Sequence, residues 1–498
     1  SFATYKSFPT FIPFDPERND NPRPEFSYDW ERNQHELKKV IKIDEEMSHI
    51  DLKSDGFKDL TIYVRTKNSD FGKLVTVQLA NTFTPTANSD FNIIDEHSLF
   101  QFSMKISPKE NTVLVPRRAN FSDADEDKRI ANLIYRNSAE YATGHNCAAD
   151  WEVDADGRCL NVSTTSCPAE EVKPVSATGD EIFSAEIIKT SMGSLSATKI
   201  SQNAANAIEA CCAIQRAYGI WISAQEQKIP YLDDRYKDQA NKNIEKCKFA
   251  LKRITDGIKY LEEDADAMKA FLLANLAMRI QKNWNDGRVD WKDPGESDLL
   301  WRPFQLAFAV MCLPSSSDRT HLEREVFDLI WFPTGGGKTE AYLLLSAYVL
   351  MLRRIRFEDA EADGVSVMMR YTLRTLTIQQ YKRAAAMITA CEVLRSTEFN
   401  ELLGQKRFSL GLWVGEASTP NSLYAAFDIL SQGGNPKSTP KQLSACPRCL
   451  NKVSLAWTRF DEPERIKVAC TNEICQQTYP FNDLPLVTVD ELLYRQPP

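Results

Sequence analysis

The sequence has no apolar run long enough to cross a membrane. Its longest such run, residues 341–352, has twelve residues, with Lys338 shortly before it and Arg353 after it. A membrane helix needs about 20 apolar residues. The first residues also lack an initiator Met and the charged-then-apolar pattern of a signal peptide. We therefore expect no membrane partner and a chain that is trimmed at its front.

The chain also lacks an excess of positive charge. Its 60 Lys and Arg residues are outnumbered by 69 Asp and Glu residues, which gives a net charge of −9. This balance excludes a protein coated in basic charge, so any contact with nucleic acid has to be local. Hydrophobic residues make up 43% of the 498 positions, which is enough for cores in about three domains.

Glycine is scarce, with only 19 residues, yet three stand together at 335–337. The β-branched and aromatic run 326–331 predicts a strand that ends before the triplet, and apolar residues at helical spacing over 343–352 predict a helix after it. Consecutive glycines let backbone N–H groups point inward, at the start of a helix, where anions are stabilised. The segment therefore predicts a phosphate-binding loop, and the alternative is a strand-to-helix turn that binds no ligand.

The residues that follow the triplet predict ATP and Mg²⁺ as ligands. Lys338 would reach the β- and γ-phosphates, and the Thr339 hydroxyl would bind Mg²⁺. Phe332 stands where the strict phosphate-loop pattern has glycine, and this variant resembles the first motif of superfamily-two helicases. Upstream, Gln305 in an Arg-Pro-Phe-Gln sequence resembles the helicase glutamine motif, which contacts adenine; the alternative is a solvent-facing helical glutamine. The candidate nucleotide-binding residues are Gln305, Thr334, Gly335, Gly336, Gly337, Lys338, Thr339 and Glu340, of which Lys338 and Thr339 are also the candidate catalytic residues.

Periodicity divides the chain into three predicted domains. Alternating stretches such as 60–64 and 74–79 predict a β-rich N-terminal domain over 1–178. Apolar residues spaced three and four apart predict a helical domain over 179–297. Residues 298–498 contain three strand-then-helix units, which imply a parallel sheet and an incomplete first RecA-like lobe. The expected fold class is therefore multidomain α/β. The three strands are expected at 326–331, 365–371 and 408–415.

A hydroxyl-rich and basic loop follows the second of these expected strands. Thr372, Arg374 and Thr375 lie there, before a helix expected over 378–395. Such a loop presents amides and cations to a DNA phosphate, and it resembles helicase motif Ia. The alternative is an ordinary strand-to-helix cap. These three residues are the candidate nucleic-acid-binding residues.

Twelve cysteines suit a reducing cytosol with a metal site better than a secreted disulfide framework, so we expect a cytoplasmic protein. Two pairs, Cys446 with Cys449 and Cys470 with Cys475, are separated by twenty residues. Each pair can supply one edge of a tetrahedron, which predicts a zinc ribbon inserted at about 440–481. Four thiolate ligands leave no open position on Zn²⁺, so the site should be structural. Free or disulfide-linked cysteines are the alternative.

Together these motifs resemble the DrmA family, the helicase subunits of the DISARM phage-defence systems of bacteria. The resemblance implies an ATP-dependent DNA helicase or translocase that works with a DrmB-like partner subunit. In that family an Asp-Glu-x-His motif and a second lobe with an arginine finger come later. Asp490 and Glu491 match this motif superficially, but we expect them to lie in a surface turn, so the sequence is expected to be a fragment that lacks the motif. The alternative function is a nucleotide-gated DNA-binding or assembly platform without motor activity.

Overall fold

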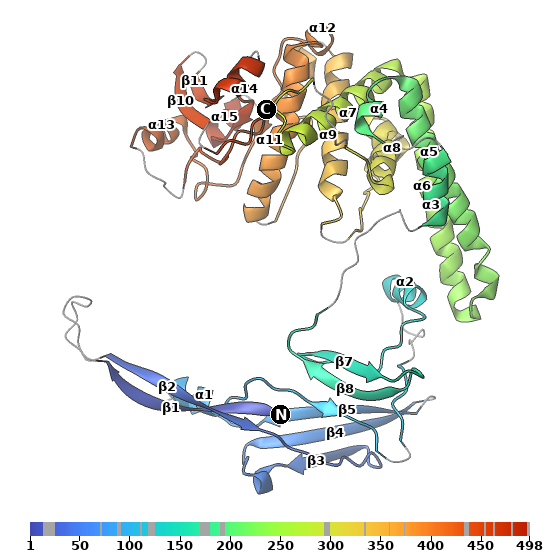
Figure 1. Cartoon of the computed structure of the whole chain (residues 1–498), viewed down its shortest axis with the longest axis vertical. Coiled ribbons are helices and arrows are strands. Elements are labelled where there is room, and N and C mark those ends of the chain that lie inside the picture. The colour runs from blue at the N-terminus through green and yellow to red at the C-terminus, as the bar shows by residue number, and fades with distance from the viewer. Residues whose placement is uncertain are drawn as a thin grey trace. The chain divides into compact units, whose positions relative to one another are not determined.

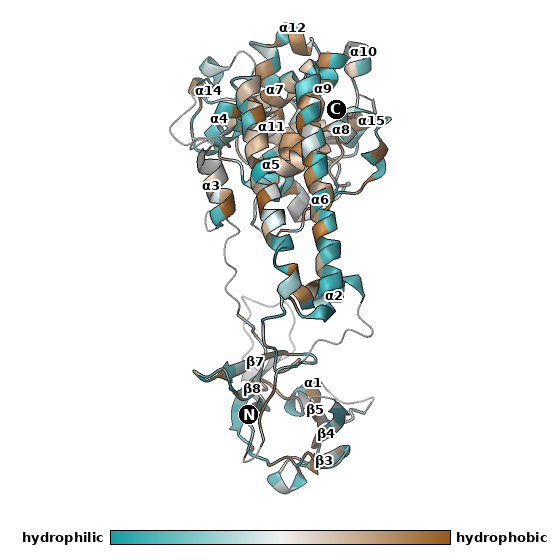
Figure 2. Ribbon diagram, turned by 90° about the vertical axis from the view of Figure 1, so that its right-hand side faces the viewer, coloured by the Kyte–Doolittle hydropathy of each residue, from teal (hydrophilic) through white to brown (hydrophobic). Residues whose placement is uncertain are grey.

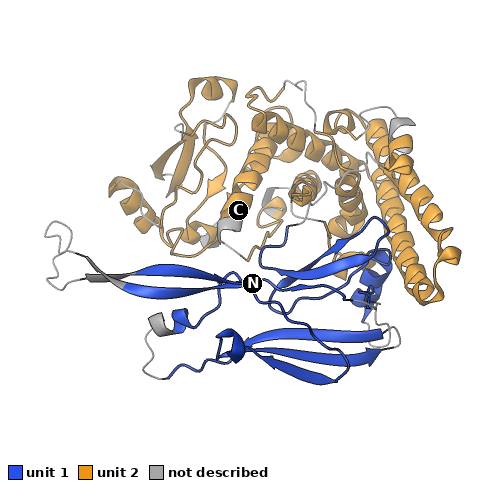
Figure 3. Cartoon of the chain, turned by 60° about the horizontal axis from the view of Figure 1, so that its bottom comes forward, with its two compact units in different colours: residues 1–172 blue, residues 173–498 orange. Residues whose placement is uncertain are grey.

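The computed structural model describes residues 1–12, 25–69, 72–86, 91–109, 112–117, 125–169, 180–189, 195–292, 299–332, 335–357, 359–372, 374–432, 438–452, 455–461, 464–479 and 482–495. The chain divides into two compact units, Ser1–Val172 and Lys173–Pro498, which Figure 3 colours separately. The segments predicted to be a helical domain and a nucleotide-binding lobe lie together in the second unit.

The first unit contains small antiparallel sheets (Figure 1). Strands β1 and β2 form a pair, and two three-stranded sheets have the orders β3-β4-β5 and β6-β8-β7. The strands are β1 Phe2–Ile12, β2 Glu25–His35, β3 Met47–Asp51, β4 Leu60–Ser69, β5 Gly72–Asn81, β6 Lys105–Ile106, β7 Ala148–Val153 and β8 Cys159–Thr165. The helices are η1 Lys53–Asp55, α1 Phe91–Glu96 and α2 Glu126–Ile134.

The strands expected at 60–64 and 74–79 are confirmed. They lie within β4 and β5, which pair in an unbroken register from Leu60 with Asn81 to Ser69 with Gly72. Their β-branched residues suit the pleated, half-buried surface of a sheet. A small core of Phe2, Leu52 and Leu60 is buried in this unit.

The second unit is mainly helical. Its helices are α3 Glu181–Lys189, α4 Ala197–Ile200, α5 Ala204–Glu226, η2 Ile229–Tyr231, α6 Asp234–Glu263, α7 Ala265–Asn285, α8 Pro303–Ser317, η3 Leu322–Glu325, α9 Lys338–Arg356, α10 Asp359–Ala362, α11 Arg374–Ser396, α12 Asn400–Leu403, α13 Leu423–Gln432, α14 Glu473–Thr478 and α15 Asp490–Arg495. The strands are β9 Leu410–Gly411, β10 Leu455–Asp461, β11 Glu464–Cys470 and β12 Leu486–Val487.

Helices α7, α9 and α11 pack together at the centre of this unit. Figure 2 shows apolar residues on these three helices, whereas α6, which is rich in charged residues, is largely hydrophilic. Phe271 of α7 and Tyr348 of α9 are fully buried in the shared core. The 3-4 spacing of apolar residues therefore predicted the long helices correctly. No described helix combines the length and apolar character that a bilayer crossing needs.

The predicted parallel sheet is largely missing from the described residues. Among the described strands only β9 and β12 pair in parallel, through two residues each, and β10 and β11 form an antiparallel hairpin. Residues 326–331 and 365–371 are described and carry no strand. A strand is stabilised by hydrogen bonds to a neighbour, and without one Phe327 and Trp331 remain 89% and 87% exposed. The unit is a mixed α/β structure, and the RecA-like lobe is not confirmed.

Candidate nucleotide and metal sites

The glycine triplet forms a tight turn into helix α9. Gly335 and Gly337 have φ angles of 85° and 82°, in the left-handed region that favours glycine. Gly337 is the N-cap residue of α9, and Lys338 is its first residue. A Cβ atom at Gly337 would lie 2.8 Å from Nε2 of Gln305, whereas one at Gly335 would meet open space. The predicted change from loop to helix is therefore present at these residues.

Helix α8 holds this turn through two side chains. Nη1 of Arg302 donates to the Gly336 carbonyl at 2.7 Å, and Nε2 of Gln305 donates to the Gly337 carbonyl at 2.6 Å. Oε1 of Gln305 accepts from the Arg302 backbone N–H at 2.9 Å. Gln305 is only 4% exposed, so the solvent-facing alternative is wrong. Both ends of its amide are hydrogen-bonded within the chain. Its contact with adenine stays a prediction.

The other candidate nucleotide-binding residues lie around the same turn. The Lys338 ammonium donates to the Phe332 carbonyl, and the Phe332 ring stacks on Phe304 of α8 at 3.9 Å. Thr339 is partly buried, and Thr334 lies outside the described residues. The carboxylate of Glu340 forms an ion pair with Arg383 of α11. The turn and the start of α9 are thus connected to α8, which precedes them in the sequence, and to α11, which follows them.

The candidate nucleic-acid loop lies at the start of α11. This helix begins at Arg374, four residues before the expected start, so Arg374 and Thr375 are its first two residues. Thr372, just before it, is exposed. The side chains of Arg374 and Thr375 lie outside the described part of the structure. The DNA contacts of all three residues stay predictions.

The four paired cysteines come together in a cluster. The Sγ atoms of Cys446, Cys449, Cys470 and Cys475 all lie within 4.8 Å of one another, and all four are free thiols. The Sγ atoms of Cys449 and Cys470 are 3.6 Å apart. Zn–S bonds of about 2.3 Å in a tetrahedron place sulfurs roughly 3.8 Å apart. The cluster therefore fits a zinc ion, and the disulfide alternative is wrong.

One turn, the end of one strand and one helix bring the thiols to this point. Leu450, at a positive φ of 57°, closes the turn that holds Cys446 and Cys449, and its N–H donates to the Cys446 carbonyl at 2.9 Å. Cys470 ends β11. In α14, the Asn472 side chain caps the helix by accepting from the Cys475 N–H at 3.2 Å.

The surroundings of the cluster favour a thiolate at Cys446. A hydrogen bond from Cys475, backbone N–H groups and the Arg448 guanidinium together lower the pKa of the Cys446 thiol to about 4, whereas the pKa values of the Cys449 and Cys475 thiols are raised, by burial and by neighbouring cysteines. Arg448 is fully buried and lies 4.3 Å from the centre of the Tyr479 ring. Zn²⁺ with four thiolates carries a net negative charge, which a buried guanidinium compensates.

The cluster packs into the main core of the second unit, and its assignment to an insertion over 440–481 stays a prediction. Cys446, Cys470 and Cys475 are buried in the same core as α7 and α9. Tyr479 packs edge-on against Trp284 of α7, with ring centres 5.7 Å apart, and its hydroxyl donates to the Val289 carbonyl. A metal at this site would therefore stabilise the helical core as well as the ribbon.

Asp490 and Glu491 hold the end of the chain to the turn before α13. The Asp490 N–H donates to the Pro420 carbonyl at 3.3 Å, and Oε2 of Glu491 accepts from the Leu423 N–H at 2.8 Å. Burial raises the pKa of the Asp490 carboxyl. Asp490 is only 7% exposed, so it does not lie in a surface turn as expected.

Sequence reasoning missed a buried ion pair that involves the segment before the glycine triplet. Arg253 of α6 is 2% exposed and donates to Glu323 at 2.6 Å and to Oδ2 of Asp328 at 3.0 Å. Asp328 lies in the segment that leads to the glycine triplet. The sequence carries no signal for this contact, because an arginine in an amphipathic helix usually faces solvent.

Comparison with known proteins gives one informative similarity. The chain is similar to DISARM protein DrmA of Bacillus paralicheniformis, with 32% identity over 406 residues. The match covers 76% of this chain and 35% of that protein, so the chain spans about a third of the length of its relative. No protein-family profile matches the chain. The similarity supports a DrmA-like protein.

Proposed function

We propose that this DrmA-like chain is the nucleotide-binding part of an ATP-dependent DNA helicase or translocase in a bacterial phage-defence complex. The observation that carries the proposal is the turn at Gly335 and Gly337, which opens helix α9 at Lys338 and is held by Arg302 and Gln305. A turn of this kind at a helix N-terminus suits the oxygens of a triphosphate. The similarity to DISARM protein DrmA supports the defence role.

In this proposal the amides of the glycine triplet and the Lys338 ammonium hold the triphosphate of ATP. The Thr339 hydroxyl binds Mg²⁺, which supplies charge neutralisation at the β- and γ-phosphates. Thr334 and Glu340 border the phosphates. Gln305 reads the adenine edge through the second N–H and the second oxygen lone pair of its amide, which its contacts within the chain leave over. Lys338 leaves the Phe332 carbonyl when it binds phosphate, so the resting contact keeps its long side chain near its place of action.

DNA is the proposed substrate, and a DrmB-like subunit is the proposed partner. The backbone of one DNA strand binds to the loop at Thr372, Arg374 and Thr375, at the start of α11. The ion pair between Arg383 and Glu340 joins this helix to α9, which begins at the phosphate loop. Changes at the nucleotide can therefore reach the DNA loop through two packed helices.

The test measures ATP hydrolysis by the complete protein with and without DNA. Lys338→Ala should abolish DNA-stimulated hydrolysis while leaving the thermal unfolding midpoint unchanged. Lys259→Ala is the matched control, because Lys259 is an exposed lysine of α6 that pairs with Glu263. Retention of the stimulated rate in Lys338→Ala would refute the proposal.

The second candidate function is a nucleotide-gated DNA-binding or assembly platform without motor activity. The observation that favours it is the absence of a parallel sheet beneath the glycine triplet among the described residues. A platform would bind ATP through Lys338, and its DNA affinity would depend on nucleotide, but DNA would not raise its rate of hydrolysis. The same assay distinguishes the two functions.

A further inference from the structure

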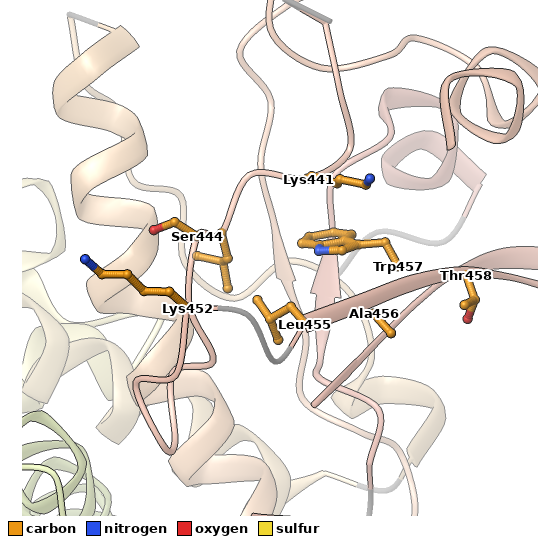
Figure 4. Close-up of a pocket in the computed structure, with 8 residues that line it drawn as sticks. Lys441, Ser444, Lys452, Leu455, Ala456, Trp457 and Thr458 are labelled. Atoms are coloured by element: carbon orange, nitrogen blue, oxygen red, sulfur yellow. The ribbon is translucent and has the colours of Figure 1, made fainter. Parts of the chain in front are cut away.

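A pocket of about 440 Å³ lies beside the β10–β11 hairpin, away from the glycine triplet in the sequence. Such a volume is within the usual range of small-ligand sites, about 300–1,000 Å³. Figure 4 shows Ser444 and Lys452 on one side of it and Trp457 on the other, with Leu455 between them. Lys441 and Thr458 also line it.

The charge of this pocket is opposite to that of the chain. The described residues that line it include two lysines and no Asp or Glu, although the chain has a net charge of −9. A third ammonium reaches its edge, because Nζ of Lys382 in α11 donates to Oγ of Ser444 at 3.3 Å. A concave site lined by one sign of charge attracts a ligand of the other sign. The pocket is therefore suited to an anion.

The rest of the lining suits a base. Trp457 is partly exposed, and its indole provides a flat apolar surface at the pocket. Stacking on an aromatic ring together with lysines along the backbone is the usual way of binding single-stranded nucleic acid. A duplex keeps its bases paired and stacked and cannot offer one to the indole. The combination of lysines and tryptophan thus favours a single strand.

We propose that this pocket binds one nucleotide of a single-stranded DNA segment. The base stacks on Trp457, and the flanking phosphates bind Lys441 and Lys452. The inference rests on the proposed DNA-binding function and adds a second contact point to it. Lys382 lies eight residues after Arg374 in α11, about 12 Å along the helix at 1.5 Å per residue. A strand held at the start of α11 can therefore continue to the pocket.

The test uses the complete protein and fluorescently labelled oligothymidylate, with binding measured at several salt concentrations. Replacing both pocket lysines, Lys441→Gln with Lys452→Gln, should weaken binding and lower the slope of log K against log salt by about 1.4, since each single-strand phosphate contact contributes about 0.7. Lys467→Gln is the matched control, because Lys467 lies on β11 in the same hairpin and faces the Phe460 ring. Its slope should stay close to that of the wild type.

The stacking contact is tested separately. Trp457→Ala should weaken binding at least about fivefold, and Trp457→Phe, which keeps a ring, should restore most of the affinity. Bound zinc and the unfolding midpoint show whether each variant is folded. If Trp457→Ala does not fold, two other measurements decide the question. One is the binding of the lysine variants. The other is tryptophan fluorescence, whose quenching by the oligonucleotide should be lost in Trp457→Phe.

The outcomes separate this inference from the proposed motor function. If the lysine variants bind oligothymidylate as tightly as the wild type and DNA still stimulates their hydrolysis of ATP, only the pocket assignment is overturned. Binding that depends on the pocket, without any ATP hydrolysis, would overturn the motor alone. No binding of oligothymidylate by the wild type would overturn the pocket, and no stimulation of hydrolysis by any DNA would overturn the motor. Equal affinity for duplex DNA, lost equally in the variants, would overturn the assignment to a single strand.

Discussion

The side-chain amide of Gln305 donates a hydrogen bond to the carbonyl of Gly337 at 2.6 Å, so helix α8 fixes the last peptide of the glycine triplet. Arg302, at the start of the same helix, fixes the preceding peptide through the Gly336 carbonyl. The C=O and N–H groups of one peptide point in opposite directions. A carbonyl that is held by α8 therefore leaves the N–H of the next residue pointing away from α8. The two contacts thereby orient backbone donors before any ligand binds, which lowers the entropic cost of binding.

Substitution of the glycines should show how closely this turn is packed. Gly337→Ala combines a left-handed backbone with a Cβ atom 2.8 Å from Nε2 of Gln305. Gly335→Ala has the same backbone strain but open space around the new Cβ atom. The strain costs roughly 1–2 kcal/mol at either position. We expect Gly337→Ala to lower the unfolding midpoint further, and to lose more ATP affinity, as measured by thermal melting and isothermal titration. Equal effects of the two variants would contradict this.

Removal of zinc should destabilise the helical core together with the ribbon. The clustered thiols share a core with α7, and Tyr479 next to them packs on Trp284. Cys446→Ser should reduce bound zinc from about one ion per chain to a small fraction, and should lower the unfolding midpoint by several degrees. A strong chelator should have the same effect on the wild type.

The control for the zinc variant is Cys212→Ser, since Cys212 is a partly buried thiol of α5 outside the cluster. It should keep its full zinc content, as measured by atomic emission. An unchanged melting curve after complete removal of zinc would show that the ribbon does not support the core.

The long helices and the metal cluster were predictable because their signals are local. Apolar residues three and four apart define one face of a helix, and two cysteine pairs provide all four ligands of one ion. The turn at Gly335 and Gly337 was also predictable, since only glycine adopts such a backbone without strain. For these features a short stretch of sequence contains most of the interactions that determine the structure.

The strands of the predicted sheet illustrate the opposite case. Residues 326–331 and 365–371 have suitable β-branched and aromatic composition, but a strand requires a neighbour to pair with. In the described chain Leu329 and Met368 remain 69% and 75% exposed. The contacts of Arg302 and Arg253 were unpredictable for a related reason, because their partners lie 34 and 75 residues away.

The buried arginine of α6 should be important for stability. Arg253 is 2% exposed and bonded to Asp328 and Glu323, whose side chains are 19% and 20% exposed. Arg253→Met would leave two partly buried carboxylates facing each other, at a cost of about 3–5 kcal/mol. Arg235→Met is the control, since this arginine of the same helix pairs with Asp233 at the surface, where the loss is below about 1 kcal/mol.

Urea denaturation measures the difference between the two arginine variants. Adding Asp328→Asn to Arg253→Met should recover part of the lost stability, because it removes one of the two unpaired charges. If the two substitutions acted independently, their costs would add. A double variant that is less stable than Arg253→Met by the full cost of Asp328→Asn alone would show that the ion pair is not the reason for the loss.

The ion pair between Arg383 and Glu340 should couple DNA binding to nucleotide turnover. Glu340 follows Thr339 directly in α9, whereas Arg383 lies on α11, the helix that begins at the candidate DNA loop. Arg383 touches neither the glycine triplet nor the loop in the described contacts, so Arg383→Gln should preserve the basal rate of ATP hydrolysis. It should reduce the stimulation by DNA several-fold, because the charge that links the two helices is lost. Arg383→Lys, which keeps the charge, should recover much of the stimulation. A parallel fall in the basal and stimulated rates would mean that Arg383 supports the fold of the nucleotide site and does not couple it to DNA.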